Sequence, residues 1–119
     1  MYFKPGKHKN SGLKFNPLKA IISPRPIGWI SSRGSDGSVN LAPYSYFNVI
    51  SEFPPMVMFS SAPGSNSQYK DSLRNVIETS EFVANVVSSK LANKMNTSSK
   101  SFKYGESEFE AAKLAMSDC

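Results

Sequence analysis

Cysteine and histidine are almost absent from this chain of 119 residues, which contains one of each. The single cysteine, Cys119, excludes an intrachain disulfide and a zinc site built from cysteines. The single histidine, His8, excludes a metal site with two histidine ligands and argues against a Ser-His-Asp triad. His8 lies on a polar stretch between lysines, so we interpret it as solvated. We therefore predict no metal ligands and no catalytic side chain.

Long apolar runs are also missing. The longest of them, such as residues 56–59, fall far short of the ~20 residues that cross a bilayer. The first residues include lysines but no apolar run behind them, unlike a secretory signal. We therefore expect no membrane span and no signal peptide, and take the cytoplasm as the default compartment.

Basic residues outnumber acidic ones by 14 to 9, which gives a net charge of +5. This balance favours anionic partners, such as nucleic acid or a phosphorylated cofactor. The basic residues are spread along the chain without a compact run, which weakens the nucleic-acid hypothesis. We interpret six glutamates as solvated and as forming no catalytic pair: Glu52, Glu78, Glu81, Glu106, Glu108 and Glu110.

The pattern along the chain predicts short strands joined by turns, with a few helices. Residues 1–18 are expected to form an extended lead-in, and residues 19–119 a single domain. The Asp36-Gly37 pair predicts a hairpin turn. The predicted strands are 27–32, 39–42, 56–60 and 81–87; residues 43–48 are predicted as a turn and 61–67 as a loop. Helices are predicted around Tyr69, Leu73, Val76 and Ile77 with Asp71 or Ser72 as the cap, from Ser88 or Ser89 onward, and over 106–114.

Four or five short strands separated by turns favour a small β-barrel. A barrel must close, because open strands leave unpaired edges. The predicted strands are few for closure, so we expect a barrel that is incomplete as given or is completed by a partner.

Three blocks of residues carry the strongest functional signal. Residues 24–32 are PRPIGWISS, residues 40–48 are NLAPYSYFN, and residues 70–75 are KDSLRN, with Asp-Gly and Pro-Pro pairs between them. In this order the blocks closely resemble the flavin reductase-like family of FMN-binding split barrels. That family includes short-chain flavin reductases and the reductase components of two-component monooxygenases. The resemblance runs from about Phe15 to the end, and family members continue past it, so the chain resembles the N-terminal portion of the family. Ser72 stands where threonine is commoner.

The resemblance implies a mainly β fold with helices, an FMN-binding split β-barrel, and a flavin site. An isoalloxazine ring needs a flat apolar slot that backbone groups approach closely, which the small and aromatic residues of 40–48 would supply. A phosphate needs hydroxyls, amides and positive charge, which paired serines and the start of a helix would supply. The candidate cofactor-binding residues are Trp29, Ser31, Ser32, Leu41, Ala42, Pro43, Ser45, Phe47, Asn48, Ser60, Ser61, Lys70, Asp71 and Ser72. The alternative is structural: the aromatic residues are core, and Asp71 and Ser72 cap a helix.

The resemblance also implies an oxidoreductase that takes hydride from NAD(P)H onto FMN, with FAD as the alternative flavin. Electrons would pass to free flavin, a partner monooxygenase or another acceptor, and the protein would be a homodimer. No acid-base side chain is needed, because the cofactor carries the chemistry. Two other hypotheses stay open: a non-enzymatic flavin-binding module, and a small basic β-barrel that binds nucleic acid. A face that clusters basic and aromatic residues would favour the latter, and the sequence shows none.

Overall fold

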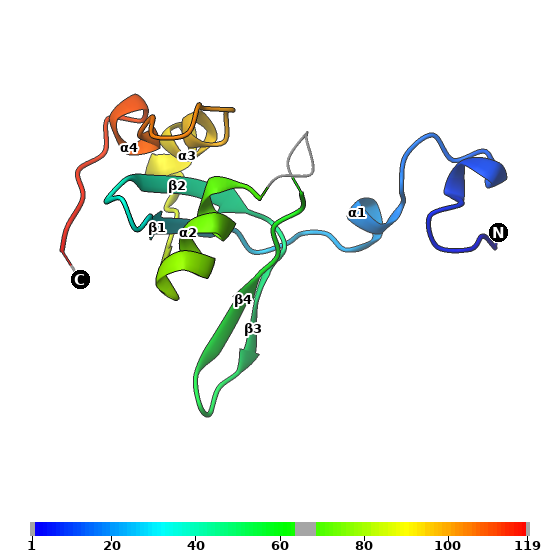
Figure 1. Ribbon diagram of the computed structural model, residues 1–119. Coiled ribbons are helices and arrows are strands. Elements are labelled where there is room, and N and C mark those ends of the chain that lie inside the picture. Colours follow the sequence, from blue (N-terminus) through cyan, green and yellow to red (C-terminus); the bar gives the residue numbers. More distant parts are fainter. Residues whose placement is uncertain (1, 64–68, 119) are drawn as a thin grey trace.

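The computed structural model describes residues 2–63 and 69–118. Part of the predicted 61–67 loop, and Cys119, lie outside these residues. Figure 1 shows a small sheet with helices packed around it, a projecting hairpin and an outlying N-terminal segment. The elements in chain order are η1 (His8–Ser11), α1 (Leu18–Ile21), β1 (Gly28–Arg33), β2 (Val39–Tyr44), β3 (Phe47–Ser51), β4 (Met56–Phe59), α2 (Asp71–Thr79), β5 (Val83–Asn85), η2 (Ser89–Leu91), α3 (Ala92–Ser98) and α4 (Glu108–Ala111).

Strands β1 and β2 form the hairpin that the Asp36-Gly37 pair predicts. Hydrogen bonds from Gly34 N to Ser38 O (2.8 Å) and from Gly37 N to Gly34 O (2.9 Å) close the turn. Gly37 has a φ of +85°, a left-handed conformation that glycine adopts without steric cost. The Asp36 carboxylate accepts from the hydroxyl and the N–H of Ser38, and these two bonds hold the pKa of Asp36 below its usual value.

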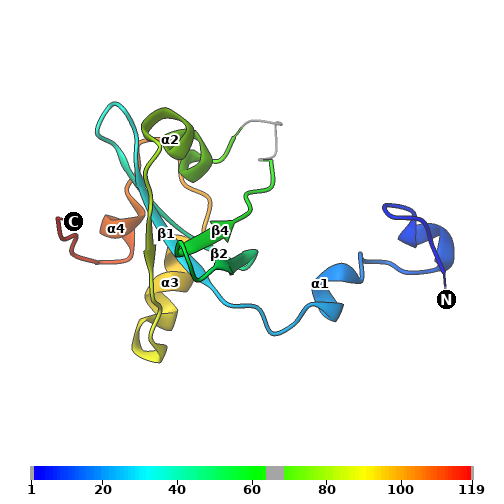
Figure 2. The same cartoon turned by 90° about the horizontal axis from the view of Figure 1, so that it is seen from below.

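The central sheet has the order β2-β1-β5, with both pairs antiparallel. Successive side chains on a strand face opposite sides, so Trp29 and Ser32 of β1 point in opposite directions. Trp29 Nε1 donates to Ser98 Oγ at the end of α3 (2.9 Å), whereas Ser32 Oγ accepts from Asn75 Nδ2 of α2 (3.2 Å). Helices α2 and α3 therefore cover opposite faces of the sheet (Figure 2). Trp29 is buried.

Strands β3 and β4 form a second antiparallel hairpin, which projects from the central sheet (Figure 1). The turn predicted over 43–48 is wrong in extent: β2 continues to Tyr44, β3 begins at Phe47, and only two residues separate them. Pro43 lies on β2, which is at the edge of its sheet and therefore tolerates a residue without N–H. Within the described residues the two sheets do not close into one barrel.

Helix α2 packs on the sheet through polar side chains. The apolar residues that predicted the helix are only partly buried or exposed, whereas Ser72 and Asn75 are each 1% exposed. Ser72 Oγ donates to Asn40 Oδ1 of β2, and Asn75 Nδ2 donates to Ser32 of β1. The predicted cap is also wrong, because Lys70 is the N-cap, and among residues 2–63 and 69–118 no side chain caps the helix. Ser72 faces the sheet because it has a partner there, which the local sequence does not reveal.

Glu108 corrects another prediction, because it is 5% exposed and not solvated. Its carboxylate accepts from Leu41 N (3.0 Å) and from Asn40 Nδ2 (2.7 Å). In an antiparallel pair, alternate N–H groups point away from the neighbouring strand. Leu41 N–H is one of these outward groups on the edge strand β2, so Glu108 satisfies a donor that the sheet leaves free. This bond fixes α4 against β2.

The N-terminal segment stands apart from the sheet (Figures 1 and 2). It is not wholly extended, since η1 lies within the predicted lead-in. The Arg25 guanidinium donates to the carbonyls of Lys19 (2.7 Å) and Ile22 (2.5 Å), at the end of α1. The division into 1–18 and 19–119 stays a prediction. Among residues 2–63 and 69–118, no helix has the length and apolar character to cross a bilayer.

Candidate functional site

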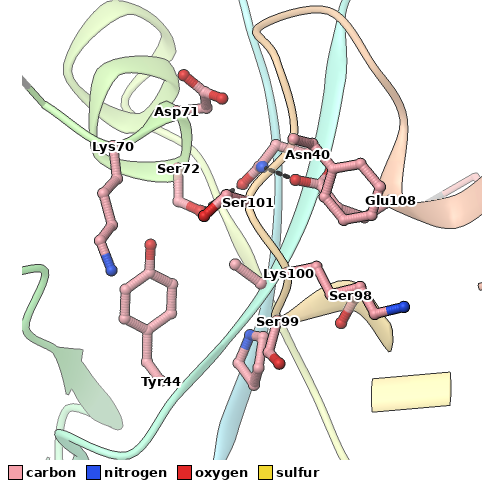
Figure 3. Close-up of a pocket in the computed structure, with 13 residues that line it drawn as sticks. Asn40, Tyr44, Lys70, Asp71, Ser72, Ser98, Ser99, Lys100, Ser101 and Glu108 are labelled. Atoms are coloured by element: carbon pink, nitrogen blue, oxygen red, sulfur yellow. Dashed lines mark hydrogen bonds between the residues drawn. The ribbon is translucent and has the colours of Figure 1, made fainter. Parts of the chain in front are cut away.

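A cavity of about 420 Å³ opens where the end of β2, the start of α2 and residues 98–102 meet (Figure 3). Three parts of the chain that are distant in sequence thus share one hollow. Its lining residues are Asn40, Ala42, Pro43, Tyr44, Lys70, Asp71, Ser72, Ser98, Ser99, Lys100, Ser101, Phe102 and Glu108.

The start of α2 supplies hydrogen-bond donors to this cavity. The first intrahelical bond runs from Arg74 N to Lys70 O, so the N–H groups of the three residues before Arg74 have no partner inside the helix. No side chain of the described residues caps them. Exposed N–H groups and the helix dipole make such an end favourable for an anion. Lys70 adds a positive charge at the same place.

Tyr44 places a phenol at the cavity wall. The side chain is 6% exposed, and its buried Oη has no hydrogen-bond partner among the described residues. In Figure 3 the Tyr44 hydroxyl points between Lys70 and Ser72. Lys70 Nζ lies 5.9 Å from the centre of the Tyr44 ring, within reach of a cation–π contact. An unpartnered buried hydroxyl costs about 1–3 kcal/mol, so a polar group entering the cavity would recover that energy.

A chain of buried hydrogen bonds forms the opposite wall. Ser72 Oγ donates to Asn40 Oδ1, and Asn40 Nδ2 donates to Glu108 Oε1 (Figure 3). Burial raises the pKa of Glu108, and the nearby Asp71 carboxylate raises it further. The hydrogen bond that Glu108 accepts from the Leu41 N–H partly opposes this shift. These hydrogen bonds link α4 through β2 to the first turn of α2.

The structure brings five of the fourteen sequence-predicted residues to this cavity. They are Ala42, Pro43, Lys70, Asp71 and Ser72. Asp71 Oδ1 also lies 3.9 Å from Arg74 Nη2, so the Arg74 guanidinium partly neutralises the Asp71 carboxylate.

Ser31 and Ser32 line a different cavity of about 610 Å³, beside β5. Both hydroxyls accept hydrogen bonds from asparagines, Ser31 from Asn85 (3.1 Å) and Ser32 from Asn75 (3.2 Å). Seven candidates line neither of these two cavities: Trp29, Leu41, Ser45, Phe47, Asn48, Ser60 and Ser61. Trp29 and Leu41 are buried in the sheet, so their contact with a ligand stays a prediction.

Sequence reasoning missed the wall formed by residues 98–102 and Glu108. Residues 98–101 are Ser-Ser-Lys-Ser, a run of hydroxyls around one cation, which is the same combination that drew attention to Lys70 and Ser72. That run was a usable signal. Glu108 carried none, because its partners Asn40 and Leu41 lie 68 and 67 residues away.

The protein is mainly β with helices, and its two sheets do not close within the described residues. The cavity beside β2 is lined by polar side chains that include Lys70 and Lys100. A family model described as the flavin reductase like domain matches residues 22–118. The chain therefore belongs to the flavin reductase like family.

Solved structures agree with the family. Nitrilotriacetate monooxygenase component B from Bacillus cereus matches with a TM-score of 0.80 and 31% identity, over 95% of this chain and 55% of that chain. The 2-nitrobenzoate 2-nitroreductase NbaA of Pseudomonas fluorescens matches with a TM-score of 0.74 and 33% identity, over 92% and 53%. A chain from Shewanella frigidimarina NCIMB 400 described as having a split barrel domain matches with a TM-score of 0.72 and 21% identity, over 99% and 60%, and shows the fold alone. The fold is thus that of the flavin reductase split barrels.

The chain spans about half the length of the curated relatives it matches, 55% and 47% for the first two. The rest of each of these two relatives lies outside the match.

Proposed function

We propose that this protein is an FMN-binding oxidoreductase, which takes hydride from NAD(P)H onto flavin and passes electrons to free flavin, a partner monooxygenase or another acceptor. Bound flavin would accept the hydride and hold the electrons; the chain's own residues bind and orient it. The observation that carries the proposal is a buried Tyr44 hydroxyl that has no hydrogen-bond partner among the described residues. It lies beside Lys70 and the start of α2, which no side chain of the described residues caps. These three features supply a hydroxyl hydrogen-bond donor, a cation and backbone N–H groups in one cavity.

This donor set suits the flavin phosphate. Phosphate oxygens accept hydrogen bonds, and bonds from charged donors are roughly twice as strong as neutral ones. Lys70 would contribute charge, Tyr44 a hydroxyl proton, and Asp71 and Ser72 their backbone N–H groups. FMN carries this phosphate and riboflavin does not.

The ring would lie along the β2 side of the cavity. Ala42 and Pro43 line it there, and both side chains are small and apolar. Small residues let the strand backbone approach a planar ring, which needs a flat apolar surface with polar groups at its edge. The acceptor of the electrons varies among the matched proteins, one named as a monooxygenase component and one as a nitroreductase.

Assembly as a homodimer is part of the proposal. The β3–β4 hairpin exposes large apolar side chains, Val49 at 63%, Ile50 at 59% and Phe53 at 95%. Contiguous exposed apolar surface is typical of an interaction site, and a second copy of the chain is the partner that the family resemblance implies. Sedimentation of the purified chain as a stable monomer would contradict this part.

Titration of FMN and riboflavin against Lys70→Ala tests the site. Loss of a charge-assisted bond to phosphate should weaken FMN by about one to two decades and leave riboflavin within about twofold. Lys90→Ala, which removes the same charge from an exposed position outside the cavity, is the matched control. Equal loss of both ligands in Lys70→Ala would show that Lys70 has a structural role.

Oxidation of NADH and NADPH by the flavin-loaded chain tests the activity. Turnover with either nucleotide supports the oxidoreductase. Tight FMN binding without turnover would instead identify the protein as a non-enzymatic flavin-binding module. This alternative is tested because the chain matches only 55% of the length of the first relative.

A further inference from the structure

Three buried polar side chains connect α4 to the first turn of α2. Ser72, Asn40 and Glu108 are 1%, 8% and 5% exposed. The Ser72 hydroxyl donates to the Asn40 carbonyl oxygen, and the Asn40 amide nitrogen donates to Glu108 Oε1 at 2.7 Å. Figure 3 shows these three hydrogen-bonded side chains along one side of the cavity.

The direction of these bonds is fixed by Glu108. An ionised carboxylate only accepts hydrogen bonds, and both of its oxygens here face nitrogen donors, Asn40 Nδ2 and Leu41 N. The Asn40 amide must therefore turn its nitrogen toward Glu108 and its oxygen toward Ser72. A serine hydroxyl has one proton, and that of Ser72 is committed to Asn40. Ser72 Oγ consequently offers only lone pairs to the cavity.

We propose that Glu108 is a positioning residue that sets the hydrogen-bond polarity of Ser72, so that this hydroxyl does not donate to the anion bound at the start of α2. The inference rests on the proposed function, in which that anion is the flavin phosphate. It assigns phosphate binding to Lys70 and the backbone N–H groups, and it assigns the Ser72 side chain to the link between α2 and β2.

Replacement of Glu108 by glutamine reverses this polarity. Glutamine presents one acceptor and one donor where the carboxylate presents two acceptors. Leu41 N–H cannot turn, so it takes the acceptor, and the Asn40 amide rotates to accept from the glutamine nitrogen. Asn40 Nδ2 then donates to Ser72 Oγ, and the Ser72 proton is released into the cavity.

The test compares FMN with riboflavin in four variants. Ser72→Ala should leave the ratio of the two affinities within about twofold, because its proton does not reach the phosphate. Glu108→Gln should favour FMN over riboflavin by about tenfold, because a new donor meets a charged acceptor. Ser72→Ala combined with Glu108→Gln should lose most of that gain. Glu110→Gln makes the same change of charge at an exposed position of α4 and should have less than a twofold effect.

Two results would overturn the inference. One is a loss of FMN selectivity by about tenfold in Ser72→Ala alone, which would show that Ser72 donates to the ligand. The other is an equal gain from Glu108→Gln with and without Ser72, which would show a charge effect that bypasses the hydroxyl.

A measurement without flavin separates this inference from the proposed function. In the flavin-free chain, the Asn40 side-chain amide protons should show nuclear Overhauser contacts to Glu108, and in Glu108→Gln to Ser72. Failure of every variant to bind FMN would reject the proposed function and leave this orientation testable. Amide contacts to Ser72 in the unaltered chain would reject the orientation, whatever the flavin result.

Discussion

The indole N–H of Trp29 donates a 2.9 Å hydrogen bond to the hydroxyl of Ser98, 69 residues later in the chain. Ser98 is 2% exposed, and its own proton goes to Met95 O at 2.7 Å. The bond joins the central strand to the first residue of the 98–102 segment that lines the cavity. The position of that wall therefore depends on a contact in the core.

Ser98→Ala should lower the free energy of unfolding by about 1–3 kcal/mol, because the buried Trp29 N–H loses its acceptor. Urea unfolding followed by Trp29 fluorescence measures it, since Trp29 is the single tryptophan. Ser99→Ala is the matched control: Ser99 is exposed and its hydroxyl donates to Asn96 O at the helix end, so its loss should cost less than about 1 kcal/mol. Equal costs at both positions would remove the special role of Ser98.

Gly28→Ala should destabilise the chain, because the new methyl group would lie 2.6 Å from Phe47 Cγ. Overpacking of this kind costs about 1–3 kcal/mol. The second substitution Phe47→Ala removes the ring atoms that the methyl group meets and should restore part of the loss. Thermal or urea unfolding of the single and double variants decides it. Additive losses in the double variant would show that the two residues do not meet.

Local signals predicted the elements whose causes are local. The Asp36-Gly37 pair placed the first hairpin, because a turn with φ above zero at its glycine is a property of a few residues. Helical spacing around Leu73 placed α2, which spans Asp71–Thr79. Strand β3 was missed because Pro43 and the aromatic residues after it suggest a turn. Only pairing with β4 makes Phe47–Ser51 a strand.

For the site as well, residues in local motifs were predicted and residues placed by distant contacts were not. Lys70 and Ala42 are both candidate cofactor-binding residues from the sequence, Ala42 for the ring and Lys70 for the phosphate, and both line the cavity. Each lies in a motif whose chemistry is visible in sequence. Glu108 was interpreted as solvated because an isolated glutamate usually is. Its burial depends on Asn40 and Leu41, and no local pattern records contacts across nearly 70 residues.

The pH dependence of stability should carry the signature of Glu108. Burial raises its folded-state pKa above the usual value of 4.5, so the folded chain binds the proton more readily than the unfolded chain. Stability from this group is therefore full below pH 4.5 and is lost as pH rises through the folded pKa. The free energy of unfolding of the unaltered chain minus that of Glu108→Gln should fall over this window. Urea unfolding at steps of pH from about 4 to 7 measures the difference, and a difference that rises with pH would contradict the burial of the carboxyl group.

Tyr44→Phe should change stability and flavin affinity in opposite directions. The Tyr44 hydroxyl is buried and has no partner in the part of the chain that the structure describes, so its removal should stabilise the flavin-free chain by about 1 kcal/mol. If the same hydroxyl donates to the flavin phosphate, its removal should weaken FMN by about tenfold and leave riboflavin within about twofold. Urea unfolding without ligand and titration with both flavins measure the two effects. Tyr46→Phe, at a tyrosine that is 37% exposed, should change neither by more than about 0.5 kcal/mol. A flavin-free Tyr44→Phe chain that is less stable than the original would show that the hydroxyl already has a partner, and the cavity would lose the vacant donor on which the phosphate assignment depends.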